Sequence, residues 1–353
     1  MDVIGTIRYT KRRQIGVGEG MNSEVFLAVD PQLAGEIAVK EIPKKKLGNT
    51  PAEYFREAQA MFAADHDNVV SVRYACETTD LIGLAMRYYP RGSLAPRVAA
   101  NPLGLRELLR VSDDVLRGVG RIHAAGYIHF DIKPSNVLLT AFGGATVADF
   151  GQARAYDPRT GVVTAPQVYR DSFPPELLAT GAGTVQSDVY QVGLLLYRAA
   201  NGDARFKSQI PADPARLLAA IAAGRFPDRR AFLPHVPPWL RTLIRKALRT
   251  KPEQRFGTAS DFADALARVE LRLNWETTIG GGGAITWRAR RTAQPDILVL
   301  LEPDGAAWQV KAYTERAPNP RRALGRGVHW RGGLSQPDAM TFLEEVFRAV
   351  ESG

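Results

Sequence analysis

The segment Tyr127-Ile-His-Phe-Asp-Ile-Lys-Pro-Ser-Asn-Val-Leu-Leu139 places three chemically active side chains on one short loop between apolar residues. Asp131 supplies a carboxylate, Lys133 an ammonium group and Asn136 an amide oxygen. A carboxylate can orient a hydroxyl nucleophile, a lysine can neutralise a moving phosphoryl group, and an asparagine oxygen can bind Mg²⁺. The residue types on this loop therefore indicate phosphoryl-transfer chemistry.

A second carboxylate, Asp149, follows in Val147-Ala-Asp-Phe-Gly151, after a short apolar strand. Together the two segments resemble the catalytic loop and the Asp-Phe-Gly motif of eukaryotic-type (Hanks-type) bacterial serine/threonine protein kinases. The resemblance implies that Asp131 orients the acceptor hydroxyl and that Lys133 offsets charge on the γ-phosphoryl group of ATP. It also implies that Asn136 and Asp149 hold Mg²⁺, with Mn²⁺ as an alternative metal.

A glycine-rich turn near the N-terminus is the first candidate for binding the nucleotide. Gly16, Gly18 and Gly20 would let backbone amides approach phosphate oxygens. The pattern departs from Gly-x-Gly-x-x-Gly, because its third glycine would fall on Met21 and the following valine, Val25, comes two positions late. Taken alone, the glycines favour a plain hairpin, so the phosphate contacts of this loop stay open.

The strand predicted at 36–40 ends in Lys40, whose ammonium group needs a partner because burying it unpaired is costly. The resemblance implies that Lys40 grips the α- and β-phosphates and is oriented by Glu57, on a helix predicted at 51–64. Glu53, one turn earlier on the same face, is interpreted as a surface residue. The residues that the resemblance places around the nucleotide are Val25, Ala38, Lys40, Met86 as the gatekeeper, and Tyr88 in the hinge.

The catalytic loop departs from the family pattern at one position. The arginine of His-Arg-Asp is replaced by Phe130. In many kinases that arginine holds a phosphorylated activation loop, so we hypothesise an activity that does not require phosphorylation at Thr160, Thr164, Tyr169 and Ser172. His129 is expected to brace the loop and not to act as a base.

The substrate platform is also unusual. Pro174-Pro-Glu176 resembles Ala-Pro-Glu, but the Gly-Thr that normally precedes it is missing, and Tyr169 takes the place of that threonine. The sequence that accepts phosphate therefore cannot be inferred. Two structural roles follow from the resemblance: Glu176 is expected to pair with Arg255, and Asp188 to cap the backbone of the catalytic loop.

The fold expected is the α+β, two-lobed protein-kinase fold, with a β-rich N-lobe and an α-rich C-lobe joined to a small C-terminal α+β module. Apolar residues at helical spacing predict a long packed helix at 103–125, and the last kinase helix is expected at 260–273. The predicted domains are the N-lobe at 1–90, the C-lobe at 91–272 and the module at 273–353.

The C-terminal module resembles no family that we recognise. Its glycine run at 280–283 is expected to be a flexible joint, with a tight turn as the alternative. Strands are predicted at 284–290 and 297–301, followed by a hairpin that returns through 307–313, and an amphipathic helix is predicted at 337–350. The arginine-rich stretch 316–331 is interpreted as a solvated loop in preference to a site for nucleic acid or an acidic peptide.

Composition places few limits on these expectations. The 353 residues are 45% hydrophobic and 24% charged, as in an ordinary globular protein. The net charge of +9 permits an acidic partner without requiring one. A single cysteine, Cys76, read as a buried small hydrophobe, fits a reducing compartment, and no apolar run approaches the length of a membrane span. We therefore expect a cytoplasmic protein with a protein substrate, without a membrane or nucleic-acid partner, and of undetermined oligomeric state.

Two other functions compete with a serine/threonine kinase. A pseudokinase that binds nucleotide and acts as a scaffold through its C-terminal module is favoured by the irregular glycine turn and by Phe130. The intact Lys40, Glu57 and two aspartates oppose it. A kinase-fold enzyme acting on small molecules would usually show a His-Gly-Asp-x-His loop, and Lys133 followed by Pro134 opposes that function.

Overall fold

The computed structural model describes residues 6–16, 23–46, 55–166, 170–316, 319–323 and 329–352. The chain forms two compact units. Unit 1 consists of Met1–Leu94, Asp114–Gln191 and Gly257–Ser260, and unit 2 of Ala95–Asp113, Val192–Phe256 and Asp261–Gly353. The predicted division at 90 and 272 remains a prediction.

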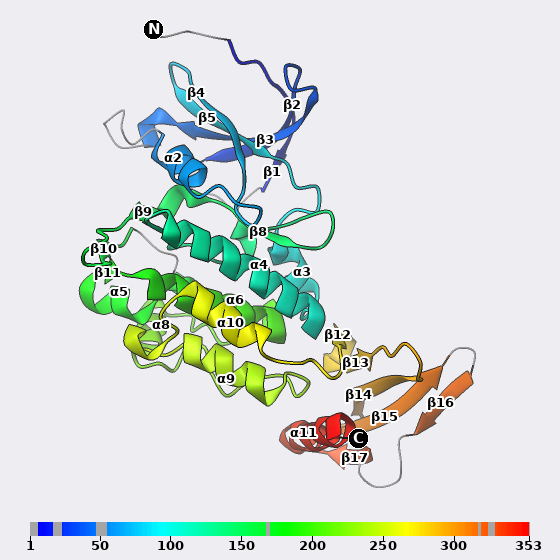
Figure 1. Cartoon of the computed structure of the whole chain (residues 1–353). Helices are drawn as coiled ribbons and strands as arrows, with labels where there is room; N and C mark the ends of the chain where they lie inside the picture. Colours follow the sequence, from blue (N-terminus) through cyan, green and yellow to red (C-terminus); the bar gives the residue numbers. More distant parts are fainter. Residues whose placement is uncertain are drawn as a thin grey trace. The chain divides into compact units, whose positions relative to one another are not determined.

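Unit 1 begins with an antiparallel sheet of five strands in the order β1-β2-β3-β5-β4 (Figure 1). The strands predicted at 25–29 and 36–40 are confirmed as parts of β2 and β3. The five strands are β1 (Thr10–Ile15), β2 (Glu24–Asp30), β3 (Gly35–Pro43), β4 (Val72–Glu77) and β5 (Leu81–Arg87).

The two faces of this sheet carry different residues, because successive side chains of a strand point to opposite faces. One face carries a core of Ala28, Ile37, Val39 and Ala85, covered by half-buried tyrosines. On the other face, Lys40 lies opposite Val25 and Ala38 lies opposite Met86. The alternation thus gives one face to the core and leaves the other to the predicted nucleotide residues.

Helices make up most of the rest of the predicted kinase region, which confirms a β-rich N-lobe followed by an α-rich C-lobe. The helix predicted at 103–125 is α4 (Leu105–Ala124), and its fully buried residues recur at helical spacing. The helix predicted at 51–64 is described as α2 (Arg56–Ala63), and residues 51–54, with Glu53, lie outside the described ranges. The other helices are α3 (Leu94–Ala100), α5 (Pro175–Thr180), α6 (Val185–Asn201), α7 (Asp203–Lys207), α8 (Pro214–Ala222), α9 (Pro238–Ala247) and α10 (Ala259–Ala267).

Short strands and 3-10 turns shape the loops of unit 1. Antiparallel pairs join β6 to β9, β7 to β8 and β10 to β11. These strands are β6 (Tyr127–Ile128), β7 (Val137–Leu139), β8 (Ala145–Val147), β9 (Arg154–Ala155), β10 (Val163–Thr164) and β11 (Ala182–Gly183). The 3-10 turns include η2 (Pro134–Asn136) and η3 (Phe150–Gln152).

Unit 2 ends in a second antiparallel sheet that carries the helix α11 (Gln336–Ser352). In Figure 1 this helix lies against β15 and β17. The predicted strands and helix are confirmed, but three strands, β12, β16 and β17, were not predicted. The strands are β12 (Trp275–Ile279), β13 (Ile285–Ala289), β14 (Asp296–Asp304), β15 (Ala307–Arg316), β16 (Asn319–Ala323) and β17 (Trp330–Leu334).

The glycine run at 280–283 is a hairpin turn between β12 and β13, so the expectation of a flexible joint was wrong. The N–H of Gly280 donates to the carbonyl oxygen of Ala284 at 2.8 Å and closes the turn. Gly282 and Gly283 have φ of 66° and 84°, which glycine adopts without the strain that a Cβ would cause. The run is glycine-rich because the turn needs left-handed backbone.

Two further expectations for this region need correction. The helix expected at 260–273 ends at Ala267, and the chain then turns and bends before β12 begins at Trp275. The side chain of Asn274, just before β12, accepts a hydrogen bond from the N–H of Arg106. The stretch 316–331 is not simply a solvated loop. Strands β16 and β17 both pair with β15, although residues 317, 318 and 324–328, including Arg326, lie outside the described ranges.

A buried histidine joins the C-terminal sheet to the helical part of unit 2. His235 is 1% exposed, and its Nδ1 accepts a hydrogen bond from the indole N–H of Trp287 at 2.9 Å. Because Nδ1 accepts, the neutral ring carries its proton on Nε2 and donates to Oγ1 of Thr277 at 3.2 Å. Phe347 of α11 packs edge-on against Trp275 and Trp287. The C-terminal sheet is therefore built into unit 2 by a shared core.

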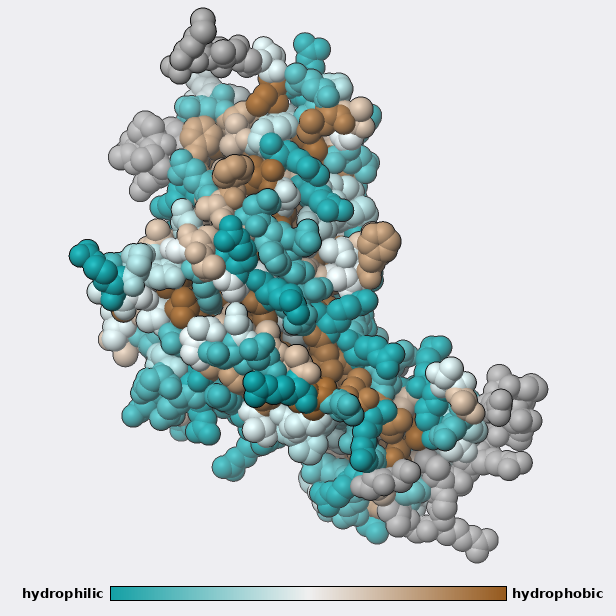
Figure 2. Space-filling model, in the orientation of Figure 1, coloured by the Kyte–Doolittle hydropathy of each residue, from teal (hydrophilic) through white to brown (hydrophobic). Residues whose placement is uncertain are grey.

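The surface bears mostly polar residues. Hydrophilic side chains cover most of the face seen in Figure 2. The large apolar side chains that are exposed include Phe62 on α2 and Phe142 in the turn between β7 and β8. Within the described ranges, no helix combines the length and the apolar character that a membrane crossing requires.

The buried junction predicts a pH dependence of stability. Burial, with a smaller contribution from Arg241, lowers the pKa of His235 from 6.5 to about 3. Between pH 6.5 and pH 3 the unfolded chain therefore binds a proton at His235 that the folded chain does not bind. Stability that is present above pH 6.5 is lost as the pH falls toward 3. Between pH 7.5 and pH 5 the stability advantage of the wild type over His235→Gln should shrink by about 2 kcal/mol.

Urea unfolding followed by tryptophan fluorescence at the two pH values measures this change. His66→Gln, which replaces an exposed histidine, is the comparison variant. An advantage of wild type over His235→Gln that is the same at both pH values would contradict the assignment of a neutral, buried imidazole.

Candidate active site

Lys40 lies at the centre of a buried ion cluster in unit 1. Its Nζ is 2.7 Å from Oε1 of Glu57 and 2.7 Å from Oδ1 of Asp149. Burial alone would lower the pKa of Lys40, but the charges of Asp149 and Glu57 outweigh burial and raise that pKa above its usual range. The lysine is thus a fixed cation held by two carboxylates.

Three separate elements deliver this cluster. Lys40 belongs to β3 and Glu57 to the first turn of α2, while Asp149 precedes η3. Asp149 has a left-handed backbone, with φ of 62°, which is strained for a residue other than glycine and which the surroundings must enforce. A Cβ on Gly151 would lie 3.3 Å from Oδ1 of Asp149, so glycine leaves room for the carboxylate.

Asp149 keeps a charge that it can offer to a metal. Burial would raise the pKa of Asp149, but the charge and the hydrogen bond of Lys40 outweigh burial and lower it to about 2. Its side chain is 36% exposed, and the contacts with Lys40 and with the N–H of Gly151 both use Oδ1. The second oxygen, Oδ2, therefore faces away from these protein partners.

The catalytic loop arranges Asp131 so that one carboxylate oxygen is tied and the other is not. Oδ2 accepts from Nζ of Lys133 at 3.0 Å and from Nδ2 of Asn136 at 2.8 Å. Oδ1 is buried and has no hydrogen-bond partner among the described residues. Burial, which outweighs the charge of Lys133, raises the pKa of Asp131. A buried acceptor without a donor is costly, and a catalytic role is one of the explanations for such a group in a folded protein.

The backbone of the loop is capped as expected by Asp188 of α6. Its Oδ2 accepts from the N–H of His129 at 2.8 Å, and its Oδ1 accepts from the N–H of Phe130 at 2.8 Å. Nε2 of His123 lies 2.8 Å from the same Oδ2. A carboxylate that receives backbone donors fixes their direction, because charge-assisted hydrogen bonds are the stronger ones.

Two more residues brace the loop, one expected and one not. His129 is fully buried, with Nε2 3.1 Å from the carbonyl oxygen of Ala148 and Nδ1 accepting from the N–H of Asp131, which confirms its structural role. Sequence reasoning missed Gln191, whose side chain accepts from the N–H of Ile132 and donates to the carbonyl oxygen of Phe130. Its place one turn after Asp188 was the signal that could have revealed it.

Phe130 makes the loop the centre of an apolar cluster. It is fully buried, with φ of 62°, and packs with Ile128 and Leu177. Half-buried residues of the activation segment, among them Val163 and Phe173, pack against the same cluster. A Cβ on Gly183 would lie 2.5 Å from the Phe130 ring. The activation segment is therefore anchored by apolar contacts where an arginine would anchor it by charge.

Four of the residues predicted to bind the nucleotide share one face of the sheet. Val25, Ala38, Lys40 and Met86 lie on it by the strand register, and Leu27 and Leu84, which were not predicted, belong to the same face. The hydroxyl of Tyr88 accepts from Arg13 at 3.2 Å. Gly16 has φ of 63°, whereas Gly18 and Gly20 lie outside the described ranges.

The donors near Asp149 fit Mg²⁺. Mg²⁺ in phosphoryl-transfer sites usually takes one or two carboxylates and completes its shell with phosphate oxygens and water. Asp149 has an oxygen to offer, and Nδ2 of Asn136 is used by Asp131, which leaves Oδ1 of Asn136 with one long contact to Ser135 at 3.3 Å. These oxygen ligands suit a hard cation such as Mg²⁺.

In the substrate-side segment, Glu176 accepts a hydrogen bond from Oγ of Ser187 at 2.7 Å. The pairing of Glu176 with Arg255 remains a prediction. Ser172 is buried, while Thr160 and Thr164 are exposed and Tyr169 lies outside the described ranges. Cys76 is half-buried, less so than expected, and burial raises the pKa of its thiol.

Comparisons with known proteins agree with this geometry. Residues 9–266 match the family model of the protein kinase domain. The chain is 31% identical over 258 residues to the serine/threonine-protein kinase PrkC of Bacillus subtilis, covering 72% of this chain and 39% of PrkC. It is 32% identical over 277 residues to the serine/threonine-protein kinase PknA of Mycobacterium tuberculosis, covering 74% of this chain and 61% of PknA.

The chain therefore belongs to the protein kinase family, and these relatives are bacterial serine/threonine-protein kinases. A third relative, the serine/threonine-protein kinase PknJ of Mycobacterium bovis, is 29% identical over 342 residues, covering 92% of this chain and 54% of PknJ. The chain thus spans between 39% and 61% of the length of these three relatives.

The apolar anchor predicts that the activation segment does not need phosphorylation. The triple variant Thr160→Ala, Thr164→Ala and Tyr169→Phe should keep the phosphoryl-transfer rate of the wild type, because Phe130 cannot pair with a phosphate. Phe130→Ala should instead destabilise the fold by about 3–5 kcal/mol, as the loss of a buried aromatic ring does. Transfer rates and urea unfolding check both statements, and a large loss of transfer in the triple variant would refute the first.

Proposed function

We propose that this chain is an ATP- and Mg²⁺-dependent serine/threonine protein kinase that transfers the γ-phosphoryl group of ATP to a protein hydroxyl. The observation that carries the proposal is that unit 1 contains both a lysine held by two carboxylates and a catalytic-loop aspartate. Lys40 is held between Glu57 and Asp149, and the catalytic loop presents Asp131 with one buried oxygen free of protein donors among the described residues. A scaffold that only bound nucleotide would have no use for the second group.

On this proposal the cation of Lys40 holds the α- and β-phosphates, and Glu57 keeps the ammonium group in position. Asp149 and Asn136 would hold Mg²⁺, which when bound neutralises charge on the phosphates, and Mn²⁺ is an alternative. The apolar face of Val25, Ala38 and Met86 would contact the adenine ring. Each assignment is a proposal that rests on the resemblance and on the contacts described above.

Asp131 would orient the acceptor hydroxyl through Oδ1, because that oxygen is the one without a donor in the described part of the chain. Lys133, tied to Oδ2, would offset charge on the transferring phosphoryl group. The transition state of phosphoryl transfer is loose, so positioning and electrostatic stabilisation provide most of the catalysis. The buried hydrogen bonds that the backbone N–H groups of the loop donate to Asp188 would supply that positioning.

The acceptor is proposed to be a serine or threonine of a protein, because the relatives are named serine/threonine-protein kinases and the loop has their Asp-x-Lys-Pro-x-Asn form. The identity of the substrate is not predicted, and neither is the oligomeric state. A cytoplasmic location is proposed on the single cysteine, which is typical of a reducing compartment.

Transfer of radiolabelled γ-phosphate from Mg-ATP to the protein itself and to a generic basic protein tests the proposal. Asp131→Asn keeps the size of the side chain and removes its charge, so transfer should fall by about 100-fold or more, the usual contribution of such a group. Asp65→Asn, at an exposed aspartate, is the matched control and should transfer at the wild-type rate.

Label on wild type and control but not on Asp131→Asn would support the proposal. Equal label on Asp131→Asn would refute the role of Asp131. Absence of label on all three proteins, with ATP still bound in a filter assay, would reject the enzyme and favour the scaffold.

A further inference from the structure

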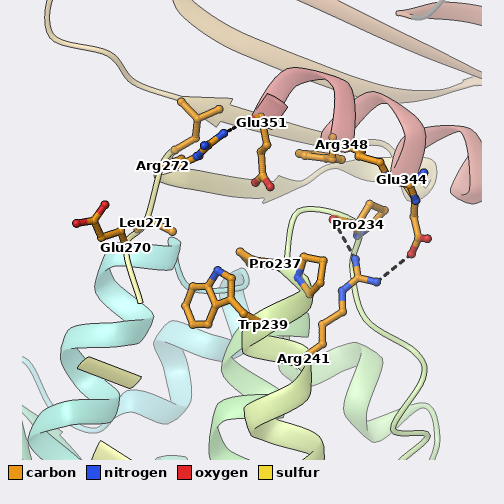
Figure 3. Close-up of a pocket in the computed structure, with 13 residues that line it drawn as sticks. Pro234, Pro237, Trp239, Arg241, Glu270, Leu271, Arg272, Glu344, Arg348 and Glu351 are labelled. Atoms are coloured by element: carbon orange, nitrogen blue, oxygen red, sulfur yellow. Dashed lines mark hydrogen bonds and ion pairs between the residues drawn. The ribbon is translucent and has the colours of Figure 1, made fainter. Parts of the chain in front are cut away.

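A cavity of about 380 Å³ lies within unit 2, between the start of α9, the segment 270–273 and the C-terminal helix α11 (Figure 3). Its apolar lining comes from prolines, from Trp239 at the start of α9 and from Phe347 of α11. A cavity of this size is in the range of small-ligand pockets, roughly 300–1,000 Å³. It is separate from the residues proposed above for catalysis.

Glu351 of α11 places at this cavity a carboxylate with few hydrogen-bond donors around it. Figure 3 shows its side chain hanging from α11 into the space above Trp239. Among the described residues, its carboxylate receives one hydrogen bond, from the indole N–H of Trp275 at the long distance of 3.3 Å. Burial raises the pKa of Glu351 and outweighs the opposing effects of Trp275, Arg272 and Arg241. The carboxylate is thus half-buried without a cation against it in the described part of the chain.

The arginines that line the cavity are directed to other partners. Arg241 donates from Nη1 to Glu344 at 3.0 Å, from Nε to the carbonyl oxygen of Val236 and from Nη2 to that of Pro234. Arg272 donates from Nη1 to the backbone oxygen of Glu351 at 2.8 Å, and not to its carboxylate. Arg241 is therefore paired with Glu344, and neither Arg241 nor Arg272 donates a hydrogen bond to the carboxylate of Glu351 in the described part of the chain. This carboxylate can accept a hydrogen bond from a ligand.

Trp239 supplies the second half of a cation site. Its side chain is partly exposed, and in Figure 3 the indole lies below the Glu351 carboxylate across the open space. The face of an indole attracts a cation, and a tryptophan does so most strongly among the aromatic residues. Trp239 and Glu351 both line this cavity, and an aromatic ring together with a carboxylate is a combination that can hold an ammonium or guanidinium group.

We propose that this cavity binds one cationic group, an ammonium or a guanidinium, with the charge at Glu351 and the face of the group on Trp239. The apolar lining fits a short aliphatic stem behind the charge, as in an arginine or lysine side chain or a free alkyl amine. Arg272 and Arg348 also line the cavity, so a polycation is disfavoured. The proposal concerns binding and does not depend on the proposed kinase activity.

The test is a titration of the full chain, labelled with ¹⁵N at its five tryptophans, and followed by the indole N–H signals in NMR spectra. The probes are acetyl-Gly-Arg-Gly-amide, the same peptide with citrulline in place of arginine, and agmatine. Trp239→Phe assigns the critical signal. The signals of Trp239 and Trp275 should shift and saturate with the arginine peptide or agmatine. Citrulline, which lacks the charge, should bind about tenfold more weakly or worse.

Glu351→Gln is the decisive variant, because glutamine keeps an acceptor for the indole of Trp275 and removes only the charge. It should weaken cation binding by about tenfold or more. Glu345→Gln, which neutralises an exposed glutamate of the same helix outside the cavity, is the matched control and should bind as wild type does.

Tighter binding of the peptide would assign the natural ligand to a basic side chain of a protein, and tighter binding of agmatine would assign it to a free amine. Shifts that do not saturate, or that are equal for arginine and citrulline, would overturn the proposal. Equal affinity of wild type and Glu351→Gln would overturn it as well.

Discussion

The pairing of Lys40 with two carboxylates is the interaction on which the architecture of unit 1 depends. Glu57 and Asp149 stand 17 and 109 residues along the chain from Lys40, and both oxygens lie 2.7 Å from its Nζ. A buried lysine without partners is costly, and in the folded chain the sheet, α2 and the segment before η3 come together around it. The same constraint that closes the fold leaves a fixed cation and a carboxylate that we propose to bind Mg²⁺ at one place.

Different interactions hold the catalytic loop in unit 1 and the C-terminal sheet in unit 2. In unit 1, Asp188 holds the catalytic loop by charge-assisted hydrogen bonds, and Phe130 ties the activation segment to the same loop by apolar packing. In unit 2, a neutral His235 joins the C-terminal sheet to the helices through Trp287 and Thr277. A buried polar network of this kind is costly if it is half-satisfied, and the C-terminal sheet is therefore an integral part of unit 2.

Structural features could be predicted from the sequence wherever a motif or a periodic pattern of apolar residues indicated the packing. The catalytic loop, Lys40, the capping role of Asp188 and the helix α4 were all predictable, since a lysine that ends an apolar strand needs a buried partner and 3.6-residue spacing of apolar residues is typical of a packed helix. The glycine run at 280–283 was not, because a linker and a hairpin turn have the same composition and only the hydrogen bond to Ala284 separates them. Strands β16 and β17 are rich in arginine and glycine and lack alternation, so their pairing with β15 leaves no local pattern.

The most direct test of this account is the rate of γ-phosphoryl transfer by Lys40→Met beside Lys11→Met. Both variants replace a lysine of the same sheet that pairs with a glutamate, but Lys11 pairs with Glu41 and lies outside the ion cluster. If the fixed cation of Lys40 organises the site, transfer by Lys40→Met should fall by about 100-fold or more, the cost of misplacing a reacting group, while Lys11→Met keeps the wild-type rate. Undiminished transfer by a folded Lys40→Met would contradict the central role given to the cluster.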